Sequence, residues 1–432
     1  MRQGWIVALA SVMLVMLVTA VPPASASQSS VLFLSTQLRP IEEAEKMRQS
    51  ILAGYPGHVE FIPVEPVPFA DRVLAETRAG RVMISLVGGV HGDFPALVNA
   101  GALQPADDVL SRLADRGFVP AYVELGKLGT PYQQYIPWMQ ATYIMVASRE
   151  ALKYLPPGAN LDSLTYGQLK AWGENLLKAT GRRLLGFPAG PKGLMHRFFQ
   201  GYLYPSYVKS TVTHFRSQEA EAMWKEFTEL WAYVNPQSTS YEFMQEPLLA
   251  GEVWVAWDHT ARLINALRER PQDFVAFPAP IGPKGRGFMP VLTGLGIVKS
   301  APNPEGAASV IEYLTRPDVQ LAILREIGGF FPVIQVAMPA DLPAGVKLAA
   351  EAVAKQSASP NAVPSLLPVG LGVRDGEFNR VFVDTFARIV LRREDVRRVL
   401  DQQAEKMRRI MAEAKAPCWP PDEPSTGACP VL

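Results

Sequence analysis

Cysteine is scarce in this chain. Of 432 residues only two are cysteines, Cys418 and Cys429. This number excludes zinc fingers, iron–sulfur clusters and densely disulfide-bonded scaffolds, because each needs more thiols than the chain has. Net charge is also nearly absent, since 42 Lys and Arg residues balance 41 Asp and Glu residues to leave +1. Binding to the phosphates of nucleic acid needs a clear basic excess, so we expect no nucleic-acid partner.

Several catalytic signatures are missing as well. The five histidines are His58, His91, His196, His214 and His259, and no two of them form an i,i+4 pair, so we predict no metal site on a helix. No G-x-S-x-G sequence occurs, which argues against a serine hydrolase of that fold. Asp and Glu pairs are abundant, but the sequence gives no separation between them. A glycan-cleaving enzyme therefore stays open as an alternative.

The first residues resemble an export signal. Arg2 precedes an apolar run from Trp5 to Val18, and the small residues Ala24-Ser25-Ala26 follow. This three-part order is typical of a secretory signal peptide, residues 1–26, and predicts cleavage after Ala26. The run is shorter than the ~20 apolar residues of a membrane anchor. No cysteine near the cleavage site could carry a lipid. We therefore expect a free periplasmic or secreted protein.

Strand and helix patterns alternate along the rest of the chain. Short apolar runs predict strands at Val31–Leu34, Val59–Pro63 and Val82–Val87, with helical patterns at Ile41–Leu52 and Phe69–Ala79 between them. This order predicts a parallel sheet with crossover helices. In such sheets ligands bind at the carboxyl ends of the strands, where residues 35–37 and 89–93 lie. The length exceeds what one hydrophobic core supports, so we expect two domains.

The last residues lack any periodic pattern. Residues 417–432 are rich in proline and small residues, which predicts a poorly ordered tail. In an oxidising compartment Cys418 and Cys429 could close a small disulfide loop there. The alternative is two free thiols on a frayed end.

Five stretches together resemble the family 1 extracellular solute-binding proteins of ABC transporters, of the carbohydrate, maltose-binding-protein-like type. The stretches are Ala100–Asp108, Leu248–Ala256, Phe277–Pro283, Thr293–Thr315 and Glu394–Met411. Each is a weak match alone, but their order and spacing follow the family along essentially the whole chain. One departure is Ala147-Ser148, where the family commonly has Tyr-Asn.

The resemblance implies an α/β fold of two lobes, the type II periplasmic-binding-protein fold. Each lobe would be a mainly parallel sheet flanked by helices, with a hinge between the lobes. Residues 27–140 and 292–332 would form the N-terminal lobe, and residues 141–291 and 333–416 the C-terminal lobe. The crossings would lie near Ala141, Leu292 and Pro332, and the lobes would close around a ligand.

The resemblance also places candidate ligand contacts. Trp257 would stack on a sugar ring, and Asp258 would accept hydrogen bonds from hydroxyls beside His259. Asp258 fits the N-cap of the next helix equally well. Arg262, one turn later, would reach a hydroxyl or an anionic group, or else lie on a solvated helix face.

Further candidates come from the other rims of the cleft. They are Gln37, His91 and Asp93 from the first lobe, Trp138, Gln140 and Thr142 from the first crossing, and His196 from the second lobe. For Trp138 a place in the core is the alternative.

The implied function is that of a binding protein, not an enzyme. It would act as a monomer that needs no cofactor or metal, capturing a sugar or oligosaccharide and delivering it to the transmembrane subunits of an ABC permease. The alternative ligands are a polyamine, a metal chelate or a phosphorylated polyol. Clustered arginines near the cleft would favour a phosphate, whereas a cage of acids and aromatics would favour a polyamine.

Overall fold

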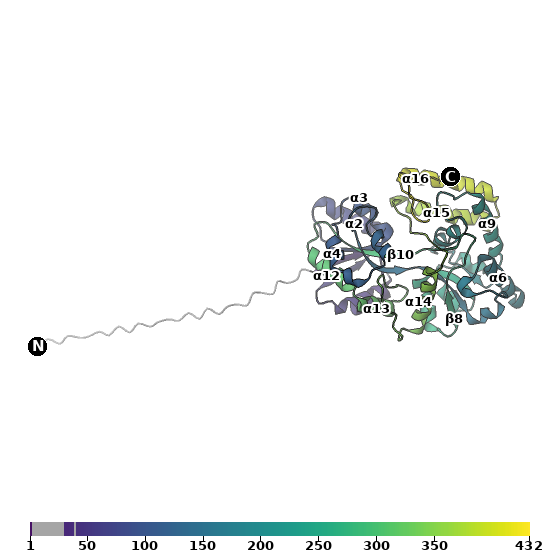
Figure 1. Cartoon of the computed structure of the whole chain (residues 1–432), viewed down its shortest axis with the longest axis horizontal. Helices are drawn as coiled ribbons and strands as arrows, with labels where there is room; N and C mark the ends of the chain where they lie inside the picture. The colour runs from purple at the N-terminus through teal and green to yellow at the C-terminus, as the bar shows by residue number, and fades with distance from the viewer. Residues whose placement is uncertain (2–29, 39) are drawn as a thin grey trace.

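The computed structural model describes Met1, residues 30–38 and residues 40–432. Apart from Met1, the predicted signal peptide and its cleavage site lie outside the described residues. The chain folds into two lobes that lie side by side (Figure 1). Within the described ranges, every helix is too short or too polar to span a bilayer.

The N-terminal lobe is built on a five-stranded sheet in the order β2-β1-β3-β10-β4. Its strands are β1 (Val31–Ser35), β2 (Val59–Pro63), β3 (Leu86–Val90), β4 (Ile136–Ala141) and β10 (Val291–Ile297). Successive side chains of β1 enter different clusters, Phe33 in one and Leu34 in another, and both are fully buried. Both faces of the sheet are therefore covered. The helices of this lobe are α1 (Ile41–Lys46), α2 (Pro66–Ala79), α3 (Pro95–Asn99), α4 (Asp107–Arg112), α5 (Pro120–Leu125), α12 (Pro304–Leu314) and α13 (Pro317–Glu326).

The C-terminal lobe has a four-stranded sheet in the order β6-β7-β5-β8 and a small sheet of two strands. The strands are β5 (Tyr143–Ser148), β6 (Leu185–Gly186), β7 (Val255–His259) and β8 (Phe274–Phe277), with β9 (Arg286–Phe288) and β11 (Ala362–Pro364) in the small sheet. The helices are α6 (Tyr166–Thr180), α7 (Met195–Phe198), α8 (Tyr204–Val208), α9 (Gln218–Trp231), α10 (Gln245–Leu249), α11 (Thr260–Glu269), α14 (Ala344–Ser357), α15 (Asp375–Phe386) and α16 (Val396–Ala414).

The two-lobe α/β fold is confirmed, with both main sheets mixed. In each of them one strand runs against the others: β10 is antiparallel to β3 and β4, and β5 to β7 and β8. These are the strands by which the chain enters each lobe from its neighbour. A strand that enters from the other lobe begins at the edge where its neighbours end, so it runs in the opposite direction.

The third crossing lies later than the expected position at Pro332. Phe118 pairs with Ile334, and the Val119 N–H donates to the Val333 carbonyl at 3.1 Å. Val333 and Ile334 are buried in the core of the N-terminal lobe. The chain therefore leaves this lobe beyond these residues and then forms α14, which packs on α11. Pro332 was expected to mark the boundary between the lobes, but the apolar residues after it fill the core of the N-terminal lobe.

Gly88 and Gly89, which follow the strand predicted at Val82–Val87, lie inside β3. A Cβ on Gly88 would be 2.8 Å from Cε2 of Phe33, and one on Gly89 would be 2.8 Å from Oδ2 of Asp93. These positions therefore need glycine because neighbouring side chains pack against the strand. The strand itself begins at Leu86, four residues after the predicted start at Val82.

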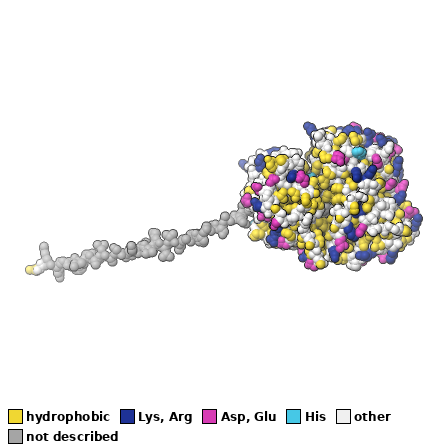
Figure 2. Space-filling view, viewed as in Figure 1, with side chains coloured by type: hydrophobic (Ala, Val, Ile, Leu, Met, Phe, Trp, Pro, Cys, Tyr) yellow, Lys and Arg dark blue, Asp and Glu magenta, His cyan; other side chains and the backbone are white. Residues whose placement is uncertain are grey.

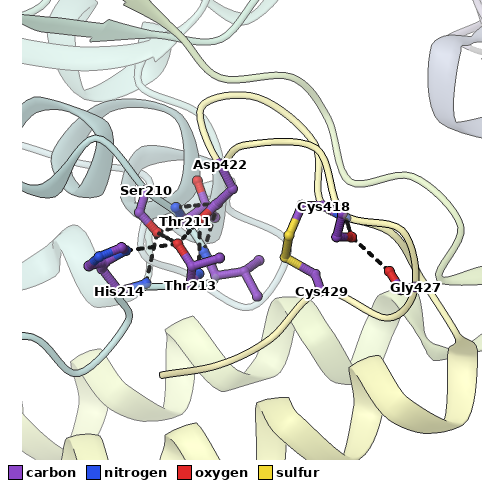
Figure 3. The surroundings of a disulfide bond; sticks show 10 residues. Ser210, Thr211, Thr213, His214, Cys418, Asp422, Gly427 and Cys429 are labelled. Atoms are coloured by element: carbon purple, nitrogen blue, oxygen red, sulfur yellow. Dashed lines mark hydrogen bonds between the residues drawn. A yellow bond between two sulfur atoms is a disulfide. The ribbon is translucent and has the colours of Figure 1, made fainter.

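The C-terminal tail is packed against the C-terminal lobe, so the expectation of a poorly ordered tail is wrong (Figure 3). Cys418 and Cys429 form a disulfide, with their Cα atoms 4.6 Å apart. The side chain of Asp422 is 4% exposed, and its carboxylate accepts the backbone N–H groups of residues 211–213 at 2.7, 2.9 and 2.8 Å. It also accepts hydrogen bonds from the hydroxyls of Ser210 and Thr213. These contacts are made with a loop some 210 residues earlier, so no local pattern could predict them.

Candidate functional site

Polar side chains gather where β1 and β3 end. Ser35 pairs with Gly88 in the parallel ladder, so the residues after both strands share one rim. The Thr36 hydroxyl donates to Oδ2 of Asp93 at 2.6 Å, and Nε2 of Gln37 donates to Oγ1 of Thr36 at 3.0 Å. Gln37 and Asp93, both predicted from the sequence, are thus brought together and half-buried on the N-terminal lobe.

His91 lies on the same rim but is turned into the lobe. Its side chain is buried, and Nδ1 lies 2.8 Å from the hydroxyl oxygen of Tyr135. Burial lowers the pKa of His91 to about 4, so the imidazole is neutral at pH 7. A neutral ring can donate one hydrogen bond and accept another.

Trp138 belongs to the core, as the alternative interpretation had it. It is fully buried, and its ring centroid lies 5.5 Å from that of Phe33.

Gln140 and Thr142 connect the crossings. The Gln140 backbone exchanges two hydrogen bonds with Phe331, at 3.0 and 2.7 Å, and its Nε2 donates to the Pro332 carbonyl at 3.0 Å. The buried Thr142 hydroxyl donates to the Met289 carbonyl at 2.9 Å. Gln140 and Thr142, both predicted as ligand contacts, therefore hold the crossing segments to one another.

Trp257 is fully buried and presents no ring face to solvent. It stacks on Tyr143 with centroids 4.8 Å apart and planes 4° apart, and the rings of Phe198 and Tyr202 contact it at 5.0 and 5.2 Å. The aromatic environment that a sugar would occupy is filled by the protein's own rings. We therefore reassign Trp257 to the core of the C-terminal lobe.

Asp258 is not the N-cap of α11. That place belongs to His259, whose Nδ1 accepts the Ala261 N–H at 3.2 Å. The Asp258 carboxylate is fully buried and accepts the backbone N–H of Met244 at 3.0 Å and of His259 at 2.7 Å. Desolvation raises its pKa to about 7, against the opposing effect of Arg262.

His259, Arg262 and His196 lie at the same edge of the C-terminal lobe. Burial, together with the positive charge of Arg262, lowers the pKa of His259 to about 3. Burial also lowers the pKa of His196, with Arg197 and Arg262 acting in the same direction. Both rings are therefore neutral hydrogen-bonding groups at pH 7.

Arg262 is held by backbone and by an aromatic ring. Its Nη1 donates to the Glu242 carbonyl at 2.9 Å, and its guanidinium lies 4.4 Å from the centroid of Phe243. Arg262 is half-buried. The alternative, in which it lies on a solvated helix face, therefore holds for only part of the side chain.

A pocket of about 530 Å³ adjoins this edge. It lies between the loop of residues 189–196 and one face of α15, where it is lined by Gly376, Asn379, Arg380 and Val383. His196 is the predicted residue that lines it. Lys192, Asn379 and Arg380 were not predicted as site residues, although the 3.6-residue period of α15 would have placed residues 376, 380 and 383 on one face.

The two lobes approach each other at the rim of the N-terminal lobe. A Cβ on Gly92 would lie 3.0 Å from the backbone oxygen of Pro368, in the segment that leads to α15. The surface is hollowed between the lobes, and hydrophobic side chains gather along the hollow (Figure 2). Two α/β lobes with polar rims, and a pocket at the edge of the C-terminal lobe, define a protein built to enclose a small solute.

The family is shown by the sequence itself. Residues 53–321 match the model of the bacterial extracellular solute-binding proteins, and the chain belongs to this family. It is a solute-binding protein, not an enzyme. No protein with a curated description matches the sequence.

Solved structures share the fold. MalE from Xanthomonas citri aligns with a TM-score of 0.71 at 14% identity, over 89% of this chain and 98% of its own. Maltose-bound MalE3 of T. maritima gives 0.69 at 19% identity, over 88% and 98%. UgpB from Mycobacterium tuberculosis, in complex with glycerophosphocholine, gives 0.70 at 16% identity, over 89% and 98%. At these identities the likeness establishes the fold and leaves the ligand open.

Proposed function

We propose that the protein captures a sugar or related polyol between its lobes, in the periplasm or outside the cell, and delivers it to the transmembrane subunits of an ABC importer. The observation that carries this proposal is the pair of polar rims on two lobes joined by three crossings. Maltose and glycerophosphocholine, the ligands of two structural neighbours, are both rich in hydroxyl groups or ester oxygens.

The proposed contacts come from both lobes. Gln37 and Asp93 would bind ligand hydroxyls from the N-terminal lobe, because an amide and a carboxylate together donate and accept. His196, His259 and Asn379 would bind from the C-terminal lobe. Their neutral rings and amide suit hydroxyls, which also both donate and accept.

Closure would turn on the crossing segments. Gln140 ties the first crossing to the segment at Phe331 and Pro332, and Thr142 ties it to Met289. A ligand held between the rims gains contacts from both lobes only when they approach, so it stabilises the closed form. The permease would then recognise that form, and the binding protein would act as a monomer.

A thermal-shift screen tests the proposal. The chain from Ser27 onward is melted alone and with monosaccharides, oligosaccharides, polyols, glycerol phosphates and polyamines. A ligand at 100 times its Kd stabilises the folded state by about 2.7 kcal/mol, which a melting curve resolves. The expected result is a shift with one sugar or polyol series that is lost in Asp93→Ala. A shift with polyamines alone, or with no compound, would contradict the proposal.

A further inference from the structure

The pocket beside α15 has cations but no acids in its lining. Lys192 and Arg380 border it, together with His196, Thr239 and Asn379, and the rest of the lining is apolar or glycine. Both cationic side chains are exposed at its edge, and no ion pair joins either of them to a carboxylate in the described part of the chain. The pocket therefore has a positive rim over an apolar interior.

Two further arginines, Arg197 and Arg262, lie close to residues of this rim. Nη1 of Arg197 donates to Oε1 of Gln200 at 2.9 Å, and Nε2 of Gln200 donates to Oδ1 of Asn379, which lines the pocket, at 2.9 Å. Arg262 donates to the Lys192 carbonyl at 3.4 Å, from the other side of the loop. Among the described residues, neither arginine forms an ion pair. Four cations thus surround one short loop.

The carboxylates near these four cations have other partners. Asp258 is fully buried behind Arg262, where it accepts two backbone N–H groups. Asp375 lies next to the pocket on α15, and its Oδ2 accepts Nδ2 of Asn379 at 2.7 Å. Glu377 and Asp384, which border the neighbouring groove together with Arg380, pair with Arg374 and Lys406. None of these four carboxylates forms an ion pair with Lys192 or Arg380 in the described residues.

The neighbouring groove between α15 and α16 shows the contrast. Arg380 borders this groove too, and two of the other cations there have acidic partners: Arg374 pairs with Glu413 at 2.7 Å and Lys406 with Asp384 at 2.9 Å. Ion pairs therefore neutralise part of the positive charge in this groove. Among the described residues, the two cations that line the pocket with His196 form no ion pair.

We propose that the solute is acidic: a polyol bearing a phosphate or carboxylate group that binds against Lys192 and Arg380. This rests on the proposed function and narrows its ligand class. The anion makes charge-assisted hydrogen bonds with the ammonium and guanidinium groups, and the apolar interior, including Leu194, Met195 and Phe386, packs against the CH groups. The neutral His196 and Asn379 take the hydroxyls.

Matched ligand pairs test the acidic group. The chain from Ser27 onward is titrated calorimetrically at low salt with glucose, glucose 6-phosphate and glucuronate, and with glycerol and glycerol 3-phosphate. We expect binding of an anionic member and at least about tenfold weaker binding of its neutral partner. The phosphate and carboxylate arms identify which anion is bound. Equal binding of the neutral partner, or silence across all pairs, overturns the acidic-ligand inference. The proposed function is decided separately, by the thermal-shift screen with its wider panel of sugars and polyols.

Charge removal locates the anion site. In Lys192→Gln/Arg380→Gln both cations are lost from exposed positions, so folding should be unaffected. Affinity for the anionic ligand should fall about tenfold, with a weaker dependence on salt. The control is Lys225→Gln/Lys347→Gln, which removes the same charge from exposed lysines of α9 and α14 outside the pocket. An equal loss in both double variants, or in neither, contradicts the site.

Discussion

The two lobes differ in how their rims would meet a ligand. On the N-terminal rim the polar groups bond to one another: Thr36 to Asp93, and His91 to Tyr135. On the C-terminal rim, Lys192 and Arg380 border a pocket without an ionic partner in the described residues. On the proposed function, recognition of the ligand would be concentrated in the C-terminal lobe. The N-terminal lobe would supply a preformed surface that closes over the bound solute.

The lobes also differ in what stabilises them. The C-terminal lobe holds a continuous group of packed aromatic rings around Trp257 and Phe198, and it contains the disulfide. Its tail is fixed by Asp422. This lobe is therefore expected to be the more resistant of the two to unfolding, and changes within it should have the larger effects on stability.

The largest effect is expected for Trp257→Ala. Removing a fully buried indole from the aromatic core should cost about 3–5 kcal/mol of unfolding free energy, measured by denaturant titration. The control, Trp254→Ala, removes a half-buried indole from the same segment and should cost less. Unchanged stability with lost ligand binding would restore the stacking role predicted from the sequence.

Asp422→Ala should come next. The change leaves three backbone N–H groups of residues 211–213 without their acceptor, which we expect to cost about 2–4 kcal/mol. Glu423→Ala is the matched control, because its carboxylate is exposed one residue away. Similar melting curves for both variants would show that the tail does not stabilise the lobe.

Asp258 gives the C-terminal lobe a pH dependence. Its pKa rises from the ordinary 3.8 to about 7 on folding, so the folded state binds the proton more tightly than the unfolded state. Protonation of Asp258 stabilises the folded state. This stabilisation is complete below pH 3.8 and is lost as the pH rises through about 7. The unfolding free energy of the wild type minus that of Asp258→Asn should therefore decrease across this window. The histidines titrate equally in both proteins and cancel, and a flat difference would contradict the raised pKa.

The smallest effect is expected at the N-terminal rim. Gly92→Ala places a methyl group against the Pro368 carbonyl oxygen, so it should hinder the approach of the lobes and weaken ligand binding by roughly fivefold. Stability should change little. Gly427→Ala, where a Cβ meets nothing within 4 Å, is the control for binding calorimetry. Unaltered affinity in Gly92→Ala would show that the contact between Gly92 and Pro368 plays no part in closure of the lobes.

Local patterns predicted much of the fold. The order of strands and helices in the first lobe depends on neighbours in sequence. The third crossing and the tail could not be placed in this way, because Ile334 and Asp422 are fixed by partners about 210 residues earlier.

The candidate site was harder to predict than the fold. Gln37, Asp93 and His196 lie on rims because strand ends and loops place them there. Trp257 was misjudged because its side-chain direction depends on Tyr143 and Tyr202 of other segments. Lys192 and Arg380 were missed because only the tertiary structure brings a turn and a helix face to one pocket.

The salt dependence of binding tests most directly whether the C-terminal lobe recognises the charge of the ligand. Affinity for the anionic ligand is measured at several salt concentrations in the wild type, in Lys192→Gln/Arg380→Gln and in Gly92→Ala. If the C-terminal lobe recognises the charge, the double variant binds more weakly with a shallower salt dependence, and Gly92→Ala binds more weakly with the wild-type dependence. The same salt dependence in all three proteins would contradict the account.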